Sequence, residues 1–140
     1  MVENLRVALD KFPYAGQYGL KETGIQADAL EQGGLPELLK KKGCTVEEIF
    51  NTKLTPEEEK QYGEINHLGL ANRHLADAVA AQTKKGILPL GLLQNCNGLM
   101  GMLAGLQRSG GWKPIRVGLV YIDAHGDFNT PETTYSGMLG

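Results

Sequence analysis

Cysteine, long apolar runs and excess basic charge are all scarce in this sequence. Its 140 residues contain only Cys44 and Cys96, and the formal net charge is −2. Two cysteines so far apart predict free thiols in a reducing cytoplasm, not a disulfide framework. No apolar run approaches the ~20 residues that a membrane-spanning helix needs. No basic stripe is present either, so we predict a cytoplasmic protein that binds neither membrane nor nucleic acid.

Glycine, in contrast, is abundant. The sequence contains 19 glycines, and its hydrophobic fraction of 41% is ordinary for a globular protein. Glycine is typical of the tight turns that join strands to helices in α/β proteins. The length is enough for one domain and for a sizeable core.

Expected strands and helices alternate along the chain. Strands are expected at residues 5–9, 45–50, 87–90 and 117–122, and helices at residues 25–42, 55–84 and 99–108. The first helix should break at Gly33 and Gly34. The second should begin with a capping box formed by Thr55 and Glu58.

This alternation predicts the fold class. Strands that alternate with helices favour a three-layer α/β fold, in which a mostly parallel, doubly wound sheet carries helices on both faces. Residues 87–90 and 117–122 should be central, neighbouring strands, because both are short and apolar. The helix at 99–108 would then cross between them on one face of the sheet.

The richest polar segment directly follows the apolar run at 117–122. Asp123, His125 and Asp127 occupy alternate positions, so in an extended segment their side chains would share one face. In open α/β sheets, ligands bind at the carboxyl ends of the strands. Two carboxylates and an imidazole suit Mn²⁺, and a carboxylate can bridge two ions. The alternative is a plain turn, in which Asp123 caps the backbone that follows.

Residues 123–127 (Asp-Ala-His-Gly-Asp), with Asn129 and Ser136 downstream, resemble the metal-binding signature of the arginase, agmatinase and formiminoglutamase family. The resemblance implies a doubly wound α/β fold and two Mn²⁺ ions that activate a hydroxide to attack an amidino carbon. Asp123 resembles the bridging carboxylate, His125 the imidazole ligand of one ion, and Asp127 a ligand of the other ion and a catalytic residue. Asn129 and Ser136 resemble positions that contact the amino-acid end of an amidino substrate.

The sequence departs from the family pattern near residue 96. Family members carry Gly-Gly-Asp-His after the preceding strand, and the histidine binds metal. Here residues 93–96 are Leu-Gln-Asn-Cys, so Asn95 stands at the aspartate position and Cys96 at the histidine position. Cys96 is therefore a candidate ligand, although a thiolate suits Mn²⁺ poorly. The competing interpretation, a small buried residue in a tight turn, is favoured. Met138 and Gly140 also replace an asparagine and a histidine of the arginases.

These observations predict that residues 1–140 are the N-terminal portion of a single arginase-like domain. The family's second aspartate-rich strand end, which supplies further metal ligands, has no counterpart in this sequence. We therefore expect an amidine or guanidine C–N hydrolase whose metal site is incomplete in this chain. It would assemble as a homo-oligomer or associate with a C-terminal half. The alternative function is a non-catalytic structural or interaction protein with a degraded metal site.

Overall fold

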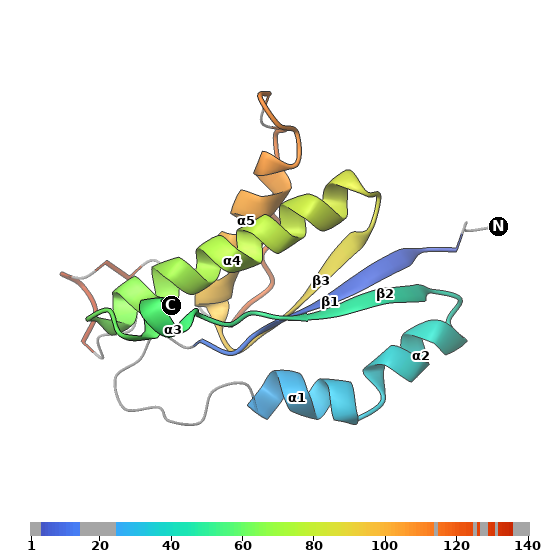
Figure 1. Cartoon of the computed structure of the whole chain (residues 1–140), viewed down its shortest axis with the longest axis horizontal. Helices are drawn as coiled ribbons and strands as arrows, with labels where there is room; N and C mark the ends of the chain where they lie inside the picture. The colour runs from blue at the N-terminus through green and yellow to red at the C-terminus, as the bar shows by residue number, and fades with distance from the viewer. Residues whose placement is uncertain are drawn as a thin grey trace.

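A parallel three-stranded sheet forms the centre of the computed structural model, which describes residues 4–14, 25–113, 115–124, 126, 129–130 and 132–135. The strand order is β2-β1-β3, and both neighbouring pairs are parallel. The first strand of the chain therefore lies in the middle of the sheet (Figure 1). The strands are β1 (Arg6–Phe12), β2 (Thr45–Asn51) and β3 (Leu88–Leu93).

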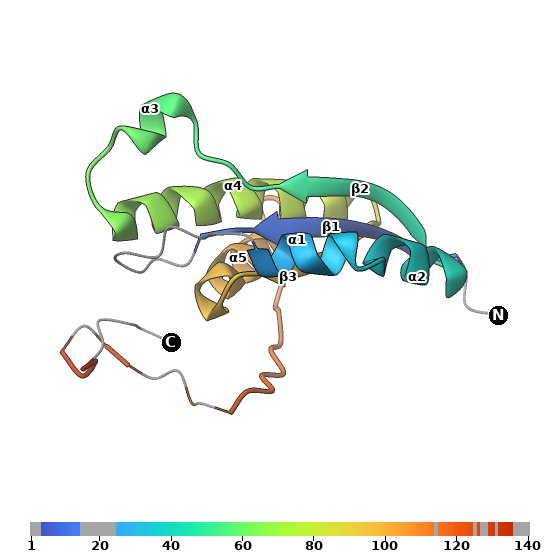
Figure 2. The same cartoon turned by 90° about the horizontal axis from the view of Figure 1, so that it is seen from below.

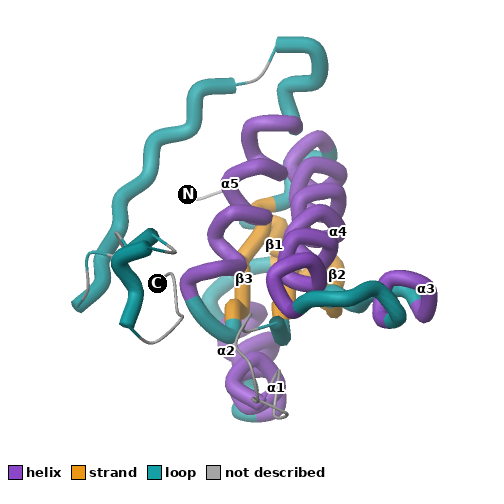
Figure 3. The backbone as a smooth tube through the Cα atoms, turned by 90° about the vertical axis from the view of Figure 1, so that its left-hand side faces the viewer, coloured by secondary structure: helices purple, strands orange, loops and turns teal. Residues whose placement is uncertain are grey.

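Helices cover both faces of the sheet. Figure 3 shows α4 and α5 on one side of the strands and α1 and α2 on the other. The helices are α1 (Ile25–Gln32), α2 (Leu35–Lys41), α3 (Pro56–Glu59), α4 (Glu64–Lys84) and α5 (Leu99–Arg108). This arrangement confirms the predicted three-layer, parallel α/β fold. None of the described helices is long and apolar enough to cross a bilayer.

Alternation along β1 divides the buried apolar side chains into two cores. Val7 and Leu9 pack with Ala27 of α1 on one face of the sheet. Phe12 packs on the other face with Leu75 of α4 and its neighbours. Successive side chains of a strand point to opposite faces, so the central strand contributes to both cores.

The capping box at Thr55 is present, but the prediction of one long helix over residues 55–84 is wrong. The Thr55 side chain accepts a hydrogen bond from the Glu58 backbone, and the Glu58 carboxylate accepts one from the Thr55 N–H at 2.9 Å. The helix stops after one turn, and α4 begins only at Glu64. Gly63 lies between the two helices with φ 103°, a conformation that a helix cannot contain and that glycine adopts without strain.

Glu58 then ties α3 back onto α4. Its carboxylate accepts hydrogen bonds from Arg73 at 2.6 Å and from the His74 ring at 2.7 Å. The Thr55 N–H and the His74 ring lower the pKa of Glu58 to about 2. Glu58 therefore joins α3 to the middle of α4, although the helix is broken between them.

Helix α5 lies unusually close to α4 at two glycines. The Gly101 N–H donates a hydrogen bond to Asn72 Oδ1 at 2.7 Å, and Asn72 in turn donates to the Leu68 carbonyl at 3.0 Å. A Cβ atom at Gly105 would lie only 2.6 Å from Val79 Cβ. The predicted helix at 99–108 is confirmed, and its small residues determine how near it sits to α4.

The predicted strand at 117–122 is not formed, which corrects the expected pair of central neighbours. Residues 115–123 carry no strand assignment, and Val120 and Ile122 are 85% and 92% exposed. Instead, β3 pairs with β1 and is an edge strand of the described sheet. Figure 2 shows this segment, in orange and red, running away from the layers after α5. An apolar run predicts extended backbone, but it does not specify which strand will pair with it.

Candidate functional site

The carboxyl ends of the three parallel strands meet at one edge of the sheet. In open α/β folds this edge is where ligands bind. After β3, the Gln94 N–H donates a hydrogen bond to the Phe12 carbonyl at 3.0 Å. This bond extends the β1–β3 ladder by one residue and holds the following turn beside the end of the central strand.

Cys96 lies in this turn, as its position after a predicted strand indicated. Residues Cys96–Gly98 form a short 3-10 helix that leads directly into α5. The Asn95 side-chain oxygen accepts a hydrogen bond from the Asn97 N–H at 3.1 Å. The Cys96 thiol is free and half-buried. The turn is therefore built by a carboxamide at the position where the family resemblance would place an acidic residue.

Of the other predicted site residues, the structure describes Asp123 and Asn129. Asp123 and Asn129 are both exposed and lie outside any strand. His125, Asp127 and Ser136 fall outside the described residues. In the part of the chain that the structure describes, no three His, Cys, Asp or Glu side chains gather closely enough to hold a metal ion. The predicted metal site therefore stays a prediction.

A charged cluster that the sequence analysis missed lies at the same edge of the sheet. The Lys11 ammonium makes ion pairs with Asp28 and Glu31 of α1, and its side chain is only 11% exposed. The hydrogen bond to Asp28 contributes most to raising the pKa of Lys11, followed by the hydrogen bond to Glu31. A cavity of about 330 Å³ adjoins the cluster. It is lined by Lys11, Pro13, Tyr14, Ala27, Asp28, Asn51, Thr52, Lys53 and Glu59.

Asp10 is a second ionisable residue that the sequence analysis did not select. It is fully buried in the central strand, and its Oδ1 accepts a hydrogen bond from Gln82 Nε2 at 2.7 Å. Its Oδ2 has no hydrogen-bond partner among the residues that the structure describes. Burial raises the pKa of Asp10 to about 6, against the lowering effect of the Gln82 hydrogen bond. The available signal was an aspartate directly after the apolar residues Val7–Leu9 of a predicted strand.

The chain resembles arginases in sequence over most of its length. No family model matches it. Over 128 residues, or 86% of the chain, it is 29% identical to Arginase-2, mitochondrial, of Homo sapiens. Its structure superimposes on that of the arginase from Bacillus subtilis with a TM-score of 0.77 and 26% sequence identity, over 96% of this chain. The chain is related to the arginase family.

The similarity covers only part of the length of each relative. The arginase from Bacillus caldovelox superimposes with a TM-score of 0.71 at 23% identity and supports the α/β fold alone. The chain spans 35% of the length of human arginase-2 and 44% of the Bacillus subtilis chain. The arginase-related segment therefore corresponds to less than half of each relative.

Proposed function

We propose that this chain is the N-terminal portion of an arginase-like, metal-dependent hydrolase that cleaves a C–N bond of a linear guanidine or amidine. The observation that carries the proposal is the match to the Bacillus subtilis arginase over 96% of this chain at a TM-score of 0.77. The Asp-Ala-His-Gly-Asp segment at residues 123–127 supports it, because it combines the ligand types that a hydrolytic metal site needs.

In this proposal, the side chains of Asp123, His125 and Asp127 hold one divalent ion such as Mn²⁺. A metal ion in such a hydrolase lowers the pKa of a bound water to generate the nucleophile. Oxygen and imidazole donors suit manganese, but the Cys96 thiol does not. Cys96 therefore does not suit a two-manganese centre, whereas the donor types of Asp123, His125 and Asp127 suit a single ion. Asn129 and Ser136 would orient the amino-acid end of the substrate.

Metal analysis of the purified chain tests the ligand assignment. We expect at most one Mn²⁺ per chain, and we expect Asp123→Ala to weaken its binding by about tenfold or more, because a charged ligand is lost. Asp77→Ala, which removes an exposed carboxylate paired with Arg108 of α5, should leave Mn²⁺ affinity unchanged. Elemental analysis measures the number of Mn²⁺ ions per chain, and isothermal titration calorimetry measures the Mn²⁺ affinity of each variant. Two tightly bound ions would contradict the proposal that the metal site is incomplete. Unchanged Mn²⁺ affinity in the Asp123→Ala variant would contradict the assignment of Asp123 as a ligand.

The chain alone should not hydrolyse arginine, agmatine or related amidines at a useful rate. A two-metal site needs enough carboxylates to neutralise two cations and to fix them ~3.5–4 Å apart. Urea or ammonia release should be assayed with guanidino and formimino substrates and added Mn²⁺, Zn²⁺ or Fe²⁺. Turnover of roughly 1–10³ per second, abolished by Asp123→Ala, would contradict this expectation.

A non-catalytic structural or interaction protein is the second candidate function. The Asn95–Asn97 hydrogen bond favours it, because Asn95, at the position of the aspartate that precedes the family's metal-binding histidine, holds the turn together. A longer form of the protein that also binds no metal would support this alternative over the hydrolase.

We further propose a cytoplasmic location and assembly as a homo-oligomer or with a C-terminal half. The free thiols of Cys44 and Cys96 are typical of a reducing compartment.

A further inference from the structure

The outer edge of β2 carries a groove that the proposed hydrolase does not use. In the described sheet, β2 pairs with β1 on one side only, so its other side is a strand edge. A groove of about 480 Å³ runs between this edge and the α1–α2 pair. It is lined by Glu31, Gln32, Pro36, Glu37, Lys40, Val46, Glu47, Glu48 and Ile49.

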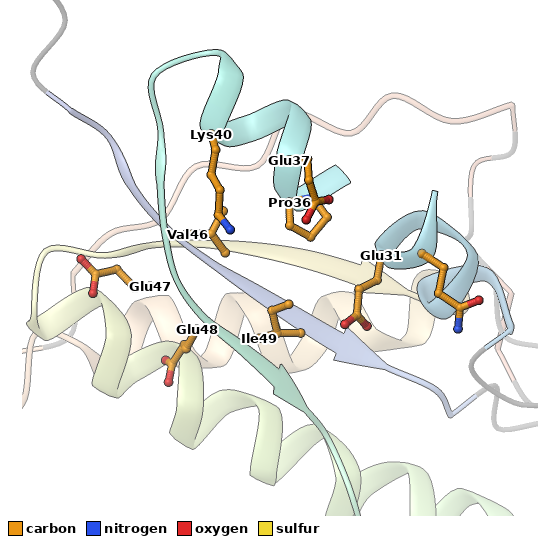
Figure 4. A pocket seen from close by; sticks show the side chains of 9 residues that line it. Glu31, Pro36, Glu37, Lys40, Val46, Glu47, Glu48 and Ile49 are labelled. Carbon is orange, nitrogen blue, oxygen red and sulfur yellow. The ribbon is translucent and has the colours of Figure 1, made fainter. Parts of the chain in front are cut away.

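The groove combines an apolar floor with acidic rims. Pro36 is buried, and Ile49 is 43% exposed. Figure 4 shows Glu37 and Lys40 on α2, Ile49 on β2 below them, and Glu48 on the other side of the strand. Carboxylates therefore flank the β2 edge on both faces of the sheet.

Two of the four carboxylates are free to meet a partner. Glu31 is paired with Lys11, and Glu47 with Arg6 at 2.6 Å. Glu37 and Glu48 make no ion pair with any residue that the structure describes. Lys40 is the only cation that lines the groove among the described residues. The rim therefore favours a positively charged ligand.

The backbone of β2 is suited to pair with another strand along half of its length. A bulge interrupts the β1–β2 register between Val46 and Glu48. From Glu48 to Asn51 the register is regular again. Exposed strand edges recruit extended peptides through main-chain hydrogen bonds, and side-chain pockets beside the edge provide specificity.

A second copy of the same chain is a poor occupant of this edge. Two β2 strands paired edge to edge would place the acidic groove of one copy beside the acidic groove of the other, and like charges oppose association. A basic peptide meets the same carboxylates with the opposite sign.

We propose that the groove binds an extended, basic segment of a partner protein, which adds to the sheet as a strand beside Glu48–Asn51. Alternate residues of the segment place apolar side chains over Pro36 and Ile49 on one face of the sheet and cationic side chains against Glu48 on the other. Glu37 adds to the negative charge of the groove. The partner is recognised by charge and by main-chain pairing, and the site is independent of the metal ligands.

Fluorescence anisotropy with a labelled peptide of alternating Lys and Val tests the proposal on the full 140-residue chain. The peptide should bind at low salt, and a matched peptide of alternating Glu and Val should not. Backbone N-methylation of the Lys/Val peptide keeps its charge but removes its donors, and should weaken binding about tenfold or more. Glu37→Lys combined with Glu48→Lys should weaken binding about tenfold, because the charge pair at Glu48 becomes repulsive and the charge of Glu37 beside the groove is reversed.

Glu57→Lys combined with Asp77→Lys is the matched control. It makes the same change in net charge at exposed positions outside the groove and should alter affinity less than about twofold. Circular dichroism checks that each variant is folded. Hydrogen exchange on the unmutated chain gives a readout without substitutions, and the peptide should protect amides within Glu48–Asn51. No binding, equal binding of the N-methylated peptide, or equal loss in both double variants would each overturn the proposal.

Discussion

Gly105→Ala is expected to destabilise the chain by about 2–3 kcal/mol, whereas the same replacement at Gly69 should stabilise it by about 0.5–1 kcal/mol. Both glycines lie inside helices, so both replacements gain the same helix propensity. The difference lies in packing. At Gly105 the added Cβ would lie 2.6 Å from Val79 Cβ and 2.8 Å from the Ala76 carbonyl oxygen. At Gly69 it would meet nothing within 4 Å.

The clash at Gly105 is costly because neither neighbour can move easily. The Ala76 carbonyl is helix backbone, and the Cβ of Val79 is fixed to the same helix. Relief therefore requires α5 to move away from α4, which also separates Leu75 and Val79 from Met102 and Leu106. A shift of this kind opens gaps in a close-packed core, and the lining atoms lose dispersion contacts.

Urea denaturation followed by circular dichroism measures both variants against the unmutated chain. Gly105→Val should be worse than Gly105→Ala, because a branched side chain adds volume at the same contact. If the alanine variants at the two glycines had equal unfolding free energies, the close approach of α4 and α5 would not exist in solution.

Asp10→Asn should stabilise the chain above pH 6 and lose this advantage as the pH falls towards 4. The folded-state pKa of Asp10 is raised to about 6 from 3.8. The protonated carboxyl is therefore favoured by folding, and this contribution is fully present below 3.8 and lost as the pH rises through 6. The gap between 3.8 and about 6 corresponds to about 3 kcal/mol.

Asp10→Asn removes the negative charge of the side chain but keeps its hydrogen bond from Gln82. The asparagine oxygen can still accept from Gln82 Nε2, and its amide nitrogen takes the place of Oδ2, which has no hydrogen-bond partner among the described residues. Unfolding free energies of both chains should be measured between pH 4 and pH 8. The lowered pKa of Glu58 makes the stability of both chains fall between pH 4.5 and about 2, so its contribution cancels in the difference between them. A difference between the two chains that does not change with pH would show that Asp10 is already solvated in the folded chain.

Local signals in the sequence were enough to predict most of the helices and the layer order. The Thr55–Glu58 capping box, the break at Gly33 and Gly34, and the helix at 99–108 depend on interactions within a few residues. The break before α4 was missed, because a single Gly63 in a periodic pattern carries no mark of its left-handed conformation.

Long-range pairings were the part that the sequence did not determine. The apolar run at 117–122 looked like a strand, but strand pairing depends on a neighbour that periodicity does not identify. For the same reason the assembly of Asp123 with other ligands stays a prediction. Asp10 was missed because its hydrogen-bond partner is remote in sequence, and only the fold brings Gln82 to it across 72 positions.

The central position of β1 has a consequence for biosynthesis. This strand leaves the ribosome before its two hydrogen-bonding partners, β2 and β3, and β3 ends only at Leu93. Closing such long loops costs chain entropy before any contact compensates for it, which slows folding. A nascent chain that ends before Leu93 would carry an apolar strand with at least one unpaired edge. Chaperones that bind exposed apolar strands should therefore recognise the nascent chain most strongly at β1, until β3 has emerged.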